Sequence, residues 1–229
     1  MTDPVSYSRR TPLRRAMQKH GTPTWQAMAG TAVVGRLREA EEIGTLGLAD
    51  LTPLPRLGFK GRGTIPAMQA RGVTVDNAPN RAFRQADGGL CLVLAAVEVL
   101  LLGALGGDGE RLDQLERTWR IADEERTYPV PRRDSHAWFG LAGSGVPAMF
   151  AKICGVDLRP HRFPDLSIAQ TSVARLNSIV VRADQAGLPV YHLLADSASA
   201  VYLLECLLDA AEEFDGRLVG VQAFMGDAT

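Results

Sequence analysis

The chain has 229 residues and a mass of 24.7 kDa, which allows one large domain or two small, closely packed ones. Its composition, with 46% hydrophobic and 22% charged residues, excludes wholesale disorder. The formal net charge of −1 argues against a protein that holds nucleic acid by bulk electrostatic attraction. The longest apolar run, residues 90–105, is too short to span a bilayer and carries Glu98 in its middle.

The charged residues are unevenly placed. The start of the chain is basic and its end is acidic, through Arg9, Arg10, Arg14, Arg15 and Lys19 on one side and Asp209, Glu212, Glu213 and Asp215 on the other. Such polarity suits docking onto a partner protein, but two solvated surface helices have the same pattern.

The cysteines, Cys91, Cys154 and Cys206, are widely spaced and form no CxxC pair. Neither a disulfide framework nor a structural zinc site is therefore expected. No apolar segment of the signal-peptide type follows the first residues, so we expect a cytoplasmic protein.

Hydrophobic patterning predicts the elements of the first half. A short amphipathic helix over 11–20 comes first, with Thr11-Pro12 as its cap and first turn. Strands are predicted over 31–37, 47–51, 56–60, 81–85 and 92–102, and helices over 64–71 and 109–121. The 92–102 segment has too little polar alternation to be exposed on either face, so a fully buried strand is expected there.

The same kinds of element return in the second half. Strands are predicted over 136–141, 171–182, 189–195 and 218–224, and helices over 146–154 and 197–214. The last helix is expected to be capped by Ser197 and to bury a stripe of Val201, Leu204, Leu208 and Ala211.

A repeat relates the two halves. Each copy reads as a strand, a glycine turn and a short helix, and the glycines that correspond are Gly58, Gly61 and Gly63 with Gly140, Gly143 and Gly145. Two glycine turns could match by chance, but the same order of elements follows both, which favours duplication. We therefore predict an α+β fold of two related antiparallel-sheet units with helices on one face, divided into a basic helical segment (1–30), a first unit (31–130) and a second unit (131–229).

No motif forms a complete active site. The glycine loop from Gly103 to Gly109 has Leu112 where a dinucleotide-binding GxGxxG turn needs its last glycine, so a strand-to-helix loop is predicted. The chain has no P-loop pattern, and Ser144 lies between two glycines rather than in a GxSxG elbow.

Asp134-Ser135-His136 looks like a piece of a hydrolase triad, but triads are assembled across a fold and neighbouring side chains are expected to point apart. The histidines, His20, His136, His161 and His192, contain no i, i+3 or i, i+4 pair, so no metal site is predicted.

Glu98 is the acidic residue inside the apolar strand predicted over 92–102. A buried carboxylate with a raised pKa could act as a general base. The alternatives are that Glu98 faces a subunit interface or pairs with an arginine. We therefore assign no catalytic residue, and the residues that bind a cofactor stay unknown.

Several segments carry a family resemblance. In the second half they are 135–143, 169–176, 181–182, 191–194 and 202–210, and together with the acidic-then-apolar strand at 97–102 they resemble the gamma subunit of heterotetrameric sarcosine oxidase. In the first half, 10–13, 47–52 and 56–61 are similar to the folate-binding domain of the glycine-cleavage T-protein. The related methylglutamate dehydrogenase has a similar subunit, so the resemblance leaves the amine substrate open.

This resemblance implies a fold like the T-protein folate-binding domain and a four-subunit flavoenzyme. Such an enzyme oxidises the N-methyl group of sarcosine and hands the one-carbon unit to tetrahydrofolate or releases formaldehyde. FAD, FMN, NAD, tetrahydrofolate and zinc are implied on the alpha, beta and delta subunits, and none on this chain alone. A structural gamma subunit is implied, with those three subunits as partners and with no nucleic acid or membrane.

One departure from the T-protein pattern bears on activity. T-proteins place an Asn-Ala pair after the long apolar strand and a catalytic Asp soon afterwards, whereas here that Asn is missing and the first Asp is Asp108. A KGCYxGQE-type segment, expected of a tRNA-modification relative, is also missing from the sequence. The alternative hypotheses are a stand-alone folate-binding or aminomethyltransferase-like protein, with Glu98 or Asp108 as its carboxylate, and the equivalent subunit of an N-methylglutamate dehydrogenase.

Overall fold

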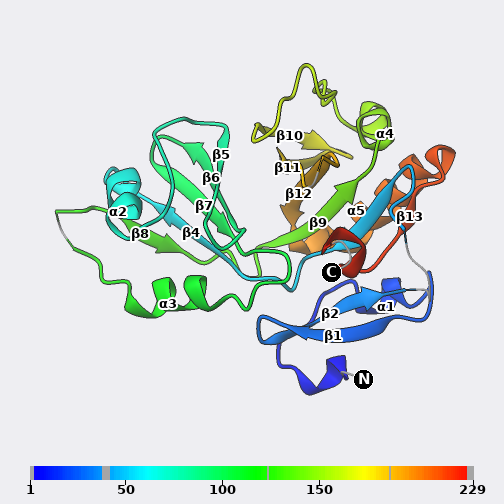
Figure 1. The fold of residues 1–229 in the computed structure, drawn as a ribbon, viewed down its shortest axis with the longest axis horizontal. Helices are drawn as coiled ribbons and strands as arrows, with labels where there is room; N and C mark the ends of the chain where they lie inside the picture. Colours follow the sequence, from blue (N-terminus) through cyan, green and yellow to red (C-terminus); the bar gives the residue numbers. More distant parts are fainter. Residues whose placement is uncertain (1–2, 38–41, 123, 186, 226–229) are drawn as a thin grey trace.

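The computed structural model describes residues 3–37, 42–122, 124–185 and 187–225, and Figure 1 shows the path of the chain. The helices are α1 (Arg14–Met17), α2 (Thr64–Ala70), α3 (Glu110–Thr118), α4 (Val146–Ile153), α5 (Ala200–Ala211) and α6 (Gln222–Met225), with 3₁₀ turns at Pro4–Ser6, Ser197–Ser199 and Glu212–Phe214. The strands are β1 (Thr24–Met28), β2 (Thr31–Arg36), β3 (Gly47–Asp50), β4 (Arg56–Lys60), β5 (Arg81–Arg84), β6 (Leu90–Ala95), β7 (Glu98–Leu102), β8 (Tyr128–Val130), β9 (His136–Ala142), β10 (Ile168–Val173), β11 (Leu176–Arg182), β12 (Val190–Asp196) and β13 (Arg217–Leu218). Within the described ranges, no helix is long and apolar enough to cross a membrane.

The strands form a hairpin and two larger sheets. The hairpin joins β1 to β2, the five-stranded sheet has the order β5-β6-β7-β4-β8, and the six-stranded sheet has the order β10-β11-β12-β9-β3-β13. Only β13 and β3 pair in parallel in the described part of the chain. Figure 1 shows the two larger sheets side by side, with the hairpin packed below the six-stranded one.

The predicted duplication is visible in the topology. In the first copy β4 is followed by α2, three strands and α3, and in the second copy β9 is followed by α4, three strands and α5. The strand orders β5-β6-β7-β4 and β10-β11-β12-β9 are equivalent. The α+β class with two related antiparallel-sheet units is thus confirmed.

The two copies also exchange a strand. β3 precedes β4 in the chain but pairs with β9, whereas β8 precedes β9 but pairs with β4. The six-stranded sheet therefore takes β3 from the segment assigned to the first unit, 31–130. Because each pairing joins one copy to the other, the exchange ties the two sheets into one structure.

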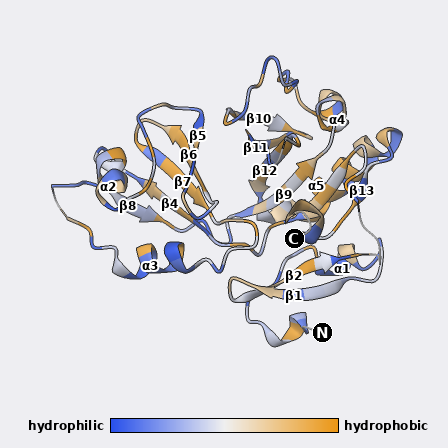
Figure 2. Cartoon of the chain, in the orientation of Figure 1, coloured by the Kyte–Doolittle hydropathy of each residue, from blue (hydrophilic) through white to orange (hydrophobic). Residues whose placement is uncertain are grey.

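Alternating side chains separate an inner from an outer face in each sheet. On the outer faces, Leu57 and Phe59 of β4 pack against α2 and α3, while Phe139 and Leu141 of β9 pack against α4 and α5. On the inner faces a third cluster lies between the sheets, formed mainly by Leu90, Leu92, Leu94, Leu100, Leu102, Trp138, Val181, Val190 and Leu194. Figure 2 shows these apolar strands flanked by more polar loops. Burying each such side chain contributes about 1.5–3 kcal/mol to folding.

The two glycine turns have a steric reason. Gly61 has φ +147° and Gly143 has φ +115°, a region that side-chain-bearing residues rarely adopt. A Cβ would lie 1.9 Å from the Arg126 carbonyl oxygen at Gly61 and 2.3 Å from the Thr45 carbonyl oxygen at Gly143. Both oxygens belong to the segment that enters the exchanged strand, so these glycines let that strand approach closely.

Two connections cross where the copies exchange strands, one leading from β3 to β4 and the other from β8 to β9. Arg56, the first residue of β4, joins these two connections. Its side chain is 1% exposed, and the guanidinium donates to carbonyls on both sides of the crossing. These acceptors are Thr52 (2.9 Å), Leu54 (3.4 Å), Arg132 (2.9 Å), Arg133 (2.8 Å) and His136. Because burial removes water from the charge, the pKa of Arg56 falls to about 10.

Asp50 continues this buried polar network at the end of β3. Its side chain accepts hydrogen bonds from Thr11 Oγ1 (2.5 Å) and from the backbone N–H of Thr52 (3.0 Å). Burial raises the pKa of Asp50, and these hydrogen bonds oppose that rise. Thr11 is thereby held against the sheet, and its hydroxyl also accepts from the Leu13 N–H (3.1 Å).

Several predicted elements were wrong in detail. The long strands predicted over 92–102 and 171–182 are hairpins, because the chain turns at residues 96–97 and at Ala174-Arg175, whose φ values are positive. The strand predicted over 218–224 is β13 followed by α6, and the helix predicted over 11–20 is only the four residues of α1. β1 and β8 were not predicted.

The last long helix is also rotated relative to its predicted stripe. The buried residues of α5 include Leu203, Leu204 and Leu207, whereas Val201 is 43% exposed. The cap before it is Asp196, which accepts from the Ala198 N–H (2.9 Å), rather than Ser197. In α3, Leu112 is buried, whereas Ile121, which falls within the predicted helix 109–121 but beyond the end of α3, is 58% exposed.

Candidate functional site

Glu98 is part of an ion-pair cluster and is not a free base. It begins β7, and its two carboxylate oxygens contact Arg132 Nη2 at 2.5 Å and Lys60 Nζ at 3.0 Å. The arginine-pairing alternative therefore describes Glu98. The cluster connects β4 and β7 to the segment that leads from β8 to β9.

Ser135 and His136 do not point apart as expected. Ser135 Oγ lies 2.7 Å from His136 Nδ1. His136 is the first residue of β9, so the pair lies where the connection from β8 enters that strand. Burial, assisted by the charges of Arg132 and Arg56, lowers the pKa of His136 to about 4. A ring with so low a pKa is a weak base at neutral pH.

Asp134 does not complete a triad with this pair. It faces Arg9 instead, with Nη2 at 2.9 Å from Oδ1, and its side chain is 81% exposed. Ser135 Oγ donates in turn to the Arg132 carbonyl (3.2 Å). Ser135 and His136 therefore anchor the entry to β9, without the third group that a catalytic triad requires.

The other sequence candidates are dispersed. Asp108 is exposed and accepts from the Glu110 N–H (3.0 Å), so it caps α3. Ser144 lies beside the start of α4. In the described ranges, no three His, Cys, Asp or Glu side chains are placed to hold a metal ion.

The space between the two sheets is almost filled. Trp138 of β9 and His192 of β12 meet there, with the Trp138 Nε1–H donating to His192 Nδ1 at 3.1 Å. Beside them lies a cavity of about 20 Å³, and a second cavity under the five-stranded sheet measures about 10 Å³. Both are the size of a water molecule, far below the roughly 300 Å³ of a typical small-molecule pocket.

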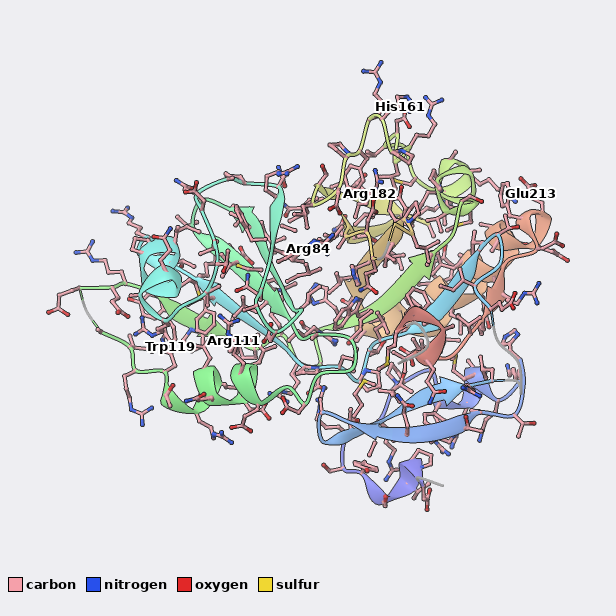
Figure 3. The ribbon with its side chains drawn as sticks, viewed as in Figure 1. Arg84, Arg111, Trp119, His161, Arg182 and Glu213 are labelled. Atoms are coloured by element: carbon pink, nitrogen blue, oxygen red, sulfur yellow. The ribbon has the colours of Figure 1, made fainter. Side chains whose placement is uncertain are left out.

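Arg84 lies at the edge of this inter-sheet space. Its guanidinium crosses from β5 to the six-stranded sheet, where it contacts Asp165 Oδ2 at 3.0 Å and the Asp184 carbonyl at 2.7 Å. Arg182 in turn binds Asp184 with two hydrogen bonds. Figure 3 shows Arg84 between the sheets and Arg182 on the six-stranded side.

The larger hollows lie on the outside, over the helices of the second copy. One measures about 640 Å³ and runs from Ser144 along α4 to His161, and its neighbour of about 450 Å³ lies between α4 and α5. The two share Ala151, Cys154 and Gly155, so we treat them as one feature, the α4–α5 groove.

The α4–α5 groove combines apolar and thiol side chains. Val156 is 36% exposed and Tyr202 is 47% exposed, and Cys154 and Cys206 are half-buried along its floor. Exposed apolar side chains beside a groove are typical of surfaces that bind other proteins. The groove therefore suits a protein partner better than a catalytic role.

A third hollow of about 570 Å³ continues past the C-terminal end of α5. It is lined by the acidic side chains Asp209, Glu212 and Asp215 together with His20 and Arg217. The acidic end of the chain is thus next to its basic start, since His20 directly follows α1 and Lys19. The basic start and the acidic end of the chain therefore partly face each other within the fold.

The chain was compared with known proteins. No protein-family model and no curated protein matches it. Among solved structures, it is similar to a chain of the heterotetrameric sarcosine oxidase of Corynebacterium sp. U-96, in complex with pyrrole 2-carboxylate, with 20% identity and a TM-score of 0.66 over 90% of this chain and 96% of that one. It is also similar to the glycine cleavage system aminomethyltransferase T of Bartonella henselae, with 15% identity and a TM-score of 0.68 over 93% of this chain and 59% of that one.

The chain has a T-protein-like fold. Both neighbours are matched over at least nine-tenths of this chain, so the fold extends through both copies and is not limited to one sheet. The two matches cover different shares of the neighbour's own length. The T-protein-like fold fills almost the whole sarcosine oxidase chain, whereas this chain spans about three-fifths of the aminomethyltransferase.

Sequence reasoning missed the buried polar residues of this T-protein-like fold. Trp138 and His192 lie in predicted strands, but no local sequence pattern indicates that they meet, since they lie 54 positions apart. Arg56 had one usable signal, a charged residue at the start of an otherwise apolar strand directly after Pro55.

Proposed function

We propose that the chain is an accessory, gamma-type subunit of a multi-subunit sarcosine oxidase. In this proposal the complex oxidatively demethylates sarcosine and transfers the one-carbon unit to tetrahydrofolate. Alpha, beta and delta subunits hold FAD, FMN, NAD, tetrahydrofolate and zinc, and this chain is structural.

The observation that carries the proposal is the length of the match. The chain corresponds to 96% of one chain of a heterotetrameric sarcosine oxidase, so a T-protein-like module of this size exists there as a separate polypeptide. The inter-sheet cavity adds support, because a volume of about 20 Å³ cannot hold a pterin ring system. The ion-paired Glu98 and the capping Asp108 weaken the alternative of autonomous aminomethyl transfer, because these are the two carboxylates that the sequence offered for it.

The first test is isolation of the tagged chain from its native host. We expect large subunits at a fixed ratio, flavin absorbance, and oxygen consumption with sarcosine. Reduction of an added electron-acceptor dye with N-methylglutamate but not with sarcosine would move the proposal to the equivalent methylglutamate dehydrogenase subunit. A chain that purifies alone, colourless, and binds tetrahydrofolate saturably would support the stand-alone alternative instead.

The α4–α5 groove is the surface that we propose for docking within this complex. The thiols of Cys154 and Cys206 can be used to detect whether this groove is covered, because both line it. Cys91 is fully buried, and burial raises the pKa of its thiol to about 12. We expect alkylation of Cys154 and Cys206 to slow in the purified complex relative to the free chain, with Cys91 unreactive in both. Equal alkylation rates in the two samples would place the interface elsewhere.

A charged substitution tests the same surface. Tyr202→Glu puts a carboxylate on the exposed part of the groove and removes the hydrogen bond from Tyr202 Oη to the Ala174 carbonyl (3.1 Å). The matched control is Tyr128→Glu, a similarly exposed tyrosine in the first copy, 49% exposed on β8. Weaker co-purification of the Tyr202 variant alone supports docking at the groove, and equal co-purification of both contradicts it.

A further inference from the structure

His192 has a defined protonation state because of its neighbour. An indole N–H can only donate, so the hydrogen bond from Trp138 Nε1 at 3.1 Å requires an unprotonated Nδ1 on His192. The ring is 2% exposed, and burial lowers its pKa to about 4, which keeps it neutral at physiological pH. The proton of the neutral ring is therefore on Nε2.

That second nitrogen has no partner in the described part of the chain. His192 Nε2 is fully buried and makes no hydrogen bond to protein. Buried donors in folded proteins almost always have a partner, either another protein group or an ordered water. An N–H in this position therefore calls for an acceptor that the protein does not itself supply.

The cavity beside the ring has room for one such acceptor. It measures about 20 Å³ and is lined by His192, Trp138, Arg84, Gln185, Leu102 and Gly103. A cavity of roughly 10–15 Å³ on the same measure holds one water, and an organic ligand does not fit. Gln185 also lines the cavity, so a polar side chain lies beside His192 there.

Arg84 closes the cavity on the solvent side. Its guanidinium lines the cavity while it is held by the Asp165 carboxylate at 3.0 Å and the Asp184 carbonyl at 2.7 Å. Figure 3 shows this side chain bridging the gap between the sheets. Because the Arg84 side chain is itself 44% exposed, its movement would open a path to solvent.

We propose that the inter-sheet cavity is a binding site for a single water molecule, which accepts a hydrogen bond from His192 Nε2–H and is retained by Arg84. This site completes the hydrogen bonding of the Trp138–His192 pair. It is independent of the proposed subunit function, since it depends on the packing of the two sheets alone.

The test combines crystallography and nuclear magnetic resonance on the full chain. A high-resolution crystal structure is expected to show a water oxygen about 2.7–3.2 Å from His192 Nε2. Long-range ¹H–¹⁵N spectra are expected to show His192 protonated on Nε2 only, with a nuclear Overhauser effect from that proton to a slowly exchanging water. An empty cavity, or a His192 ring protonated on Nδ1, overturns the proposal.

Variants separate this site from other buried water. His192→Phe removes the donor, so its crystal structure is expected to lack the water. His136→Phe is the matched control, because it removes a half-buried histidine outside the cavity, and the His192 signal and its water contact are expected to persist. Should His192→Phe not fold, Arg84→Ala serves instead, with a shorter water residence time expected and an unchanged residence time counting against retention by Arg84.

Discussion

Replacing Arg56 with methionine tests whether one buried guanidinium holds the crossing of the two copies. Methionine fills a similar part of the space with an apolar chain, so packing is largely kept while the hydrogen bonds are lost. Five backbone carbonyls would lose the hydrogen bond from Arg56, those of Thr52 and Leu54 on one side and of Arg132, Arg133 and His136 on the other.

The expected loss follows from two opposing terms. Three of these hydrogen bonds, to Thr52, Arg132 and Arg133, have ordinary lengths of 2.8–2.9 Å, and at about 1.5–3 kcal/mol for each bond from a charged donor they contribute about 4.5–9 kcal/mol. Against this, removing the charge recovers its burial cost, which the fall in the pKa of Arg56 from 12.5 to about 10 places at about 3 kcal/mol. The net destabilisation is therefore about 1.5–6 kcal/mol, a large part of the roughly 5–15 kcal/mol that stabilises a typical domain.

Urea unfolding followed by circular dichroism measures this loss for wild type, Arg56→Met and Arg56→Lys. The lysine variant keeps a charge but cannot reach both sides of the crossing, so its stability is expected to lie between the other two. Arg15→Met is the control, because Arg15 is exposed on α1. A loss below about 1 kcal/mol for Arg56→Met would show that the crossing is held by strand pairing alone.

Further changes test the turn and the buried histidine. Gly143→Val places a Cβ at 2.3 Å from the Thr45 carbonyl at φ +115°, so we expect a loss of about 3 kcal/mol or more in thermal unfolding, whereas Gly155→Val, with open space around it, is the tolerated control. The pKa of His192 is lowered from 6.5 to about 4 in the folded protein, so the unfolded chain binds the proton more tightly. His192 is therefore expected to lower stability by about 3 kcal/mol as the pH drops from 6.5 to 4. Because the pKa of His136 is also lowered to about 4, His192→Phe, if folded, should reduce but not abolish the slope of this part of the profile, measured by urea unfolding.

The elements that sequence patterning predicted best are those with strong local signals. Residues 56–60, 64–71 and 136–141 carry alternating or helical spacing next to glycine turns, and they form β4, α2 and β9 almost as predicted. The hairpin turns at 96–97 and 174–175 were missed because neither contains glycine or proline. Ala174 and Arg175 adopt positive φ there only because the paired strands on both sides hold them in place.

For the candidate site, too, local features could be predicted from the sequence and contacts between distant residues could not. From local spacing, the sequence predicts no GxSxG elbow at Ser144 and no metal site among the histidines, and both stay predictions. It could not show that Glu98 meets Arg132 and Lys60, because ion pairing depends on register between strands. It also could not show the α4–α5 groove, whose two thiols come from helices 52 positions apart.

By itself, the sequence determined the α+β class and the duplicated unit of strand, glycine turn and helix, since these depend on local periodicity and on turn residues. Only the tertiary structure decided that β3 and β8 are exchanged between the copies, that Arg56 spans their crossing and that His192 faces a water-sized cavity. Those features require contacts between residues far apart in the chain. Such contacts form when apolar faces pack and buried polar groups find partners, and no local pattern specifies which partner is found.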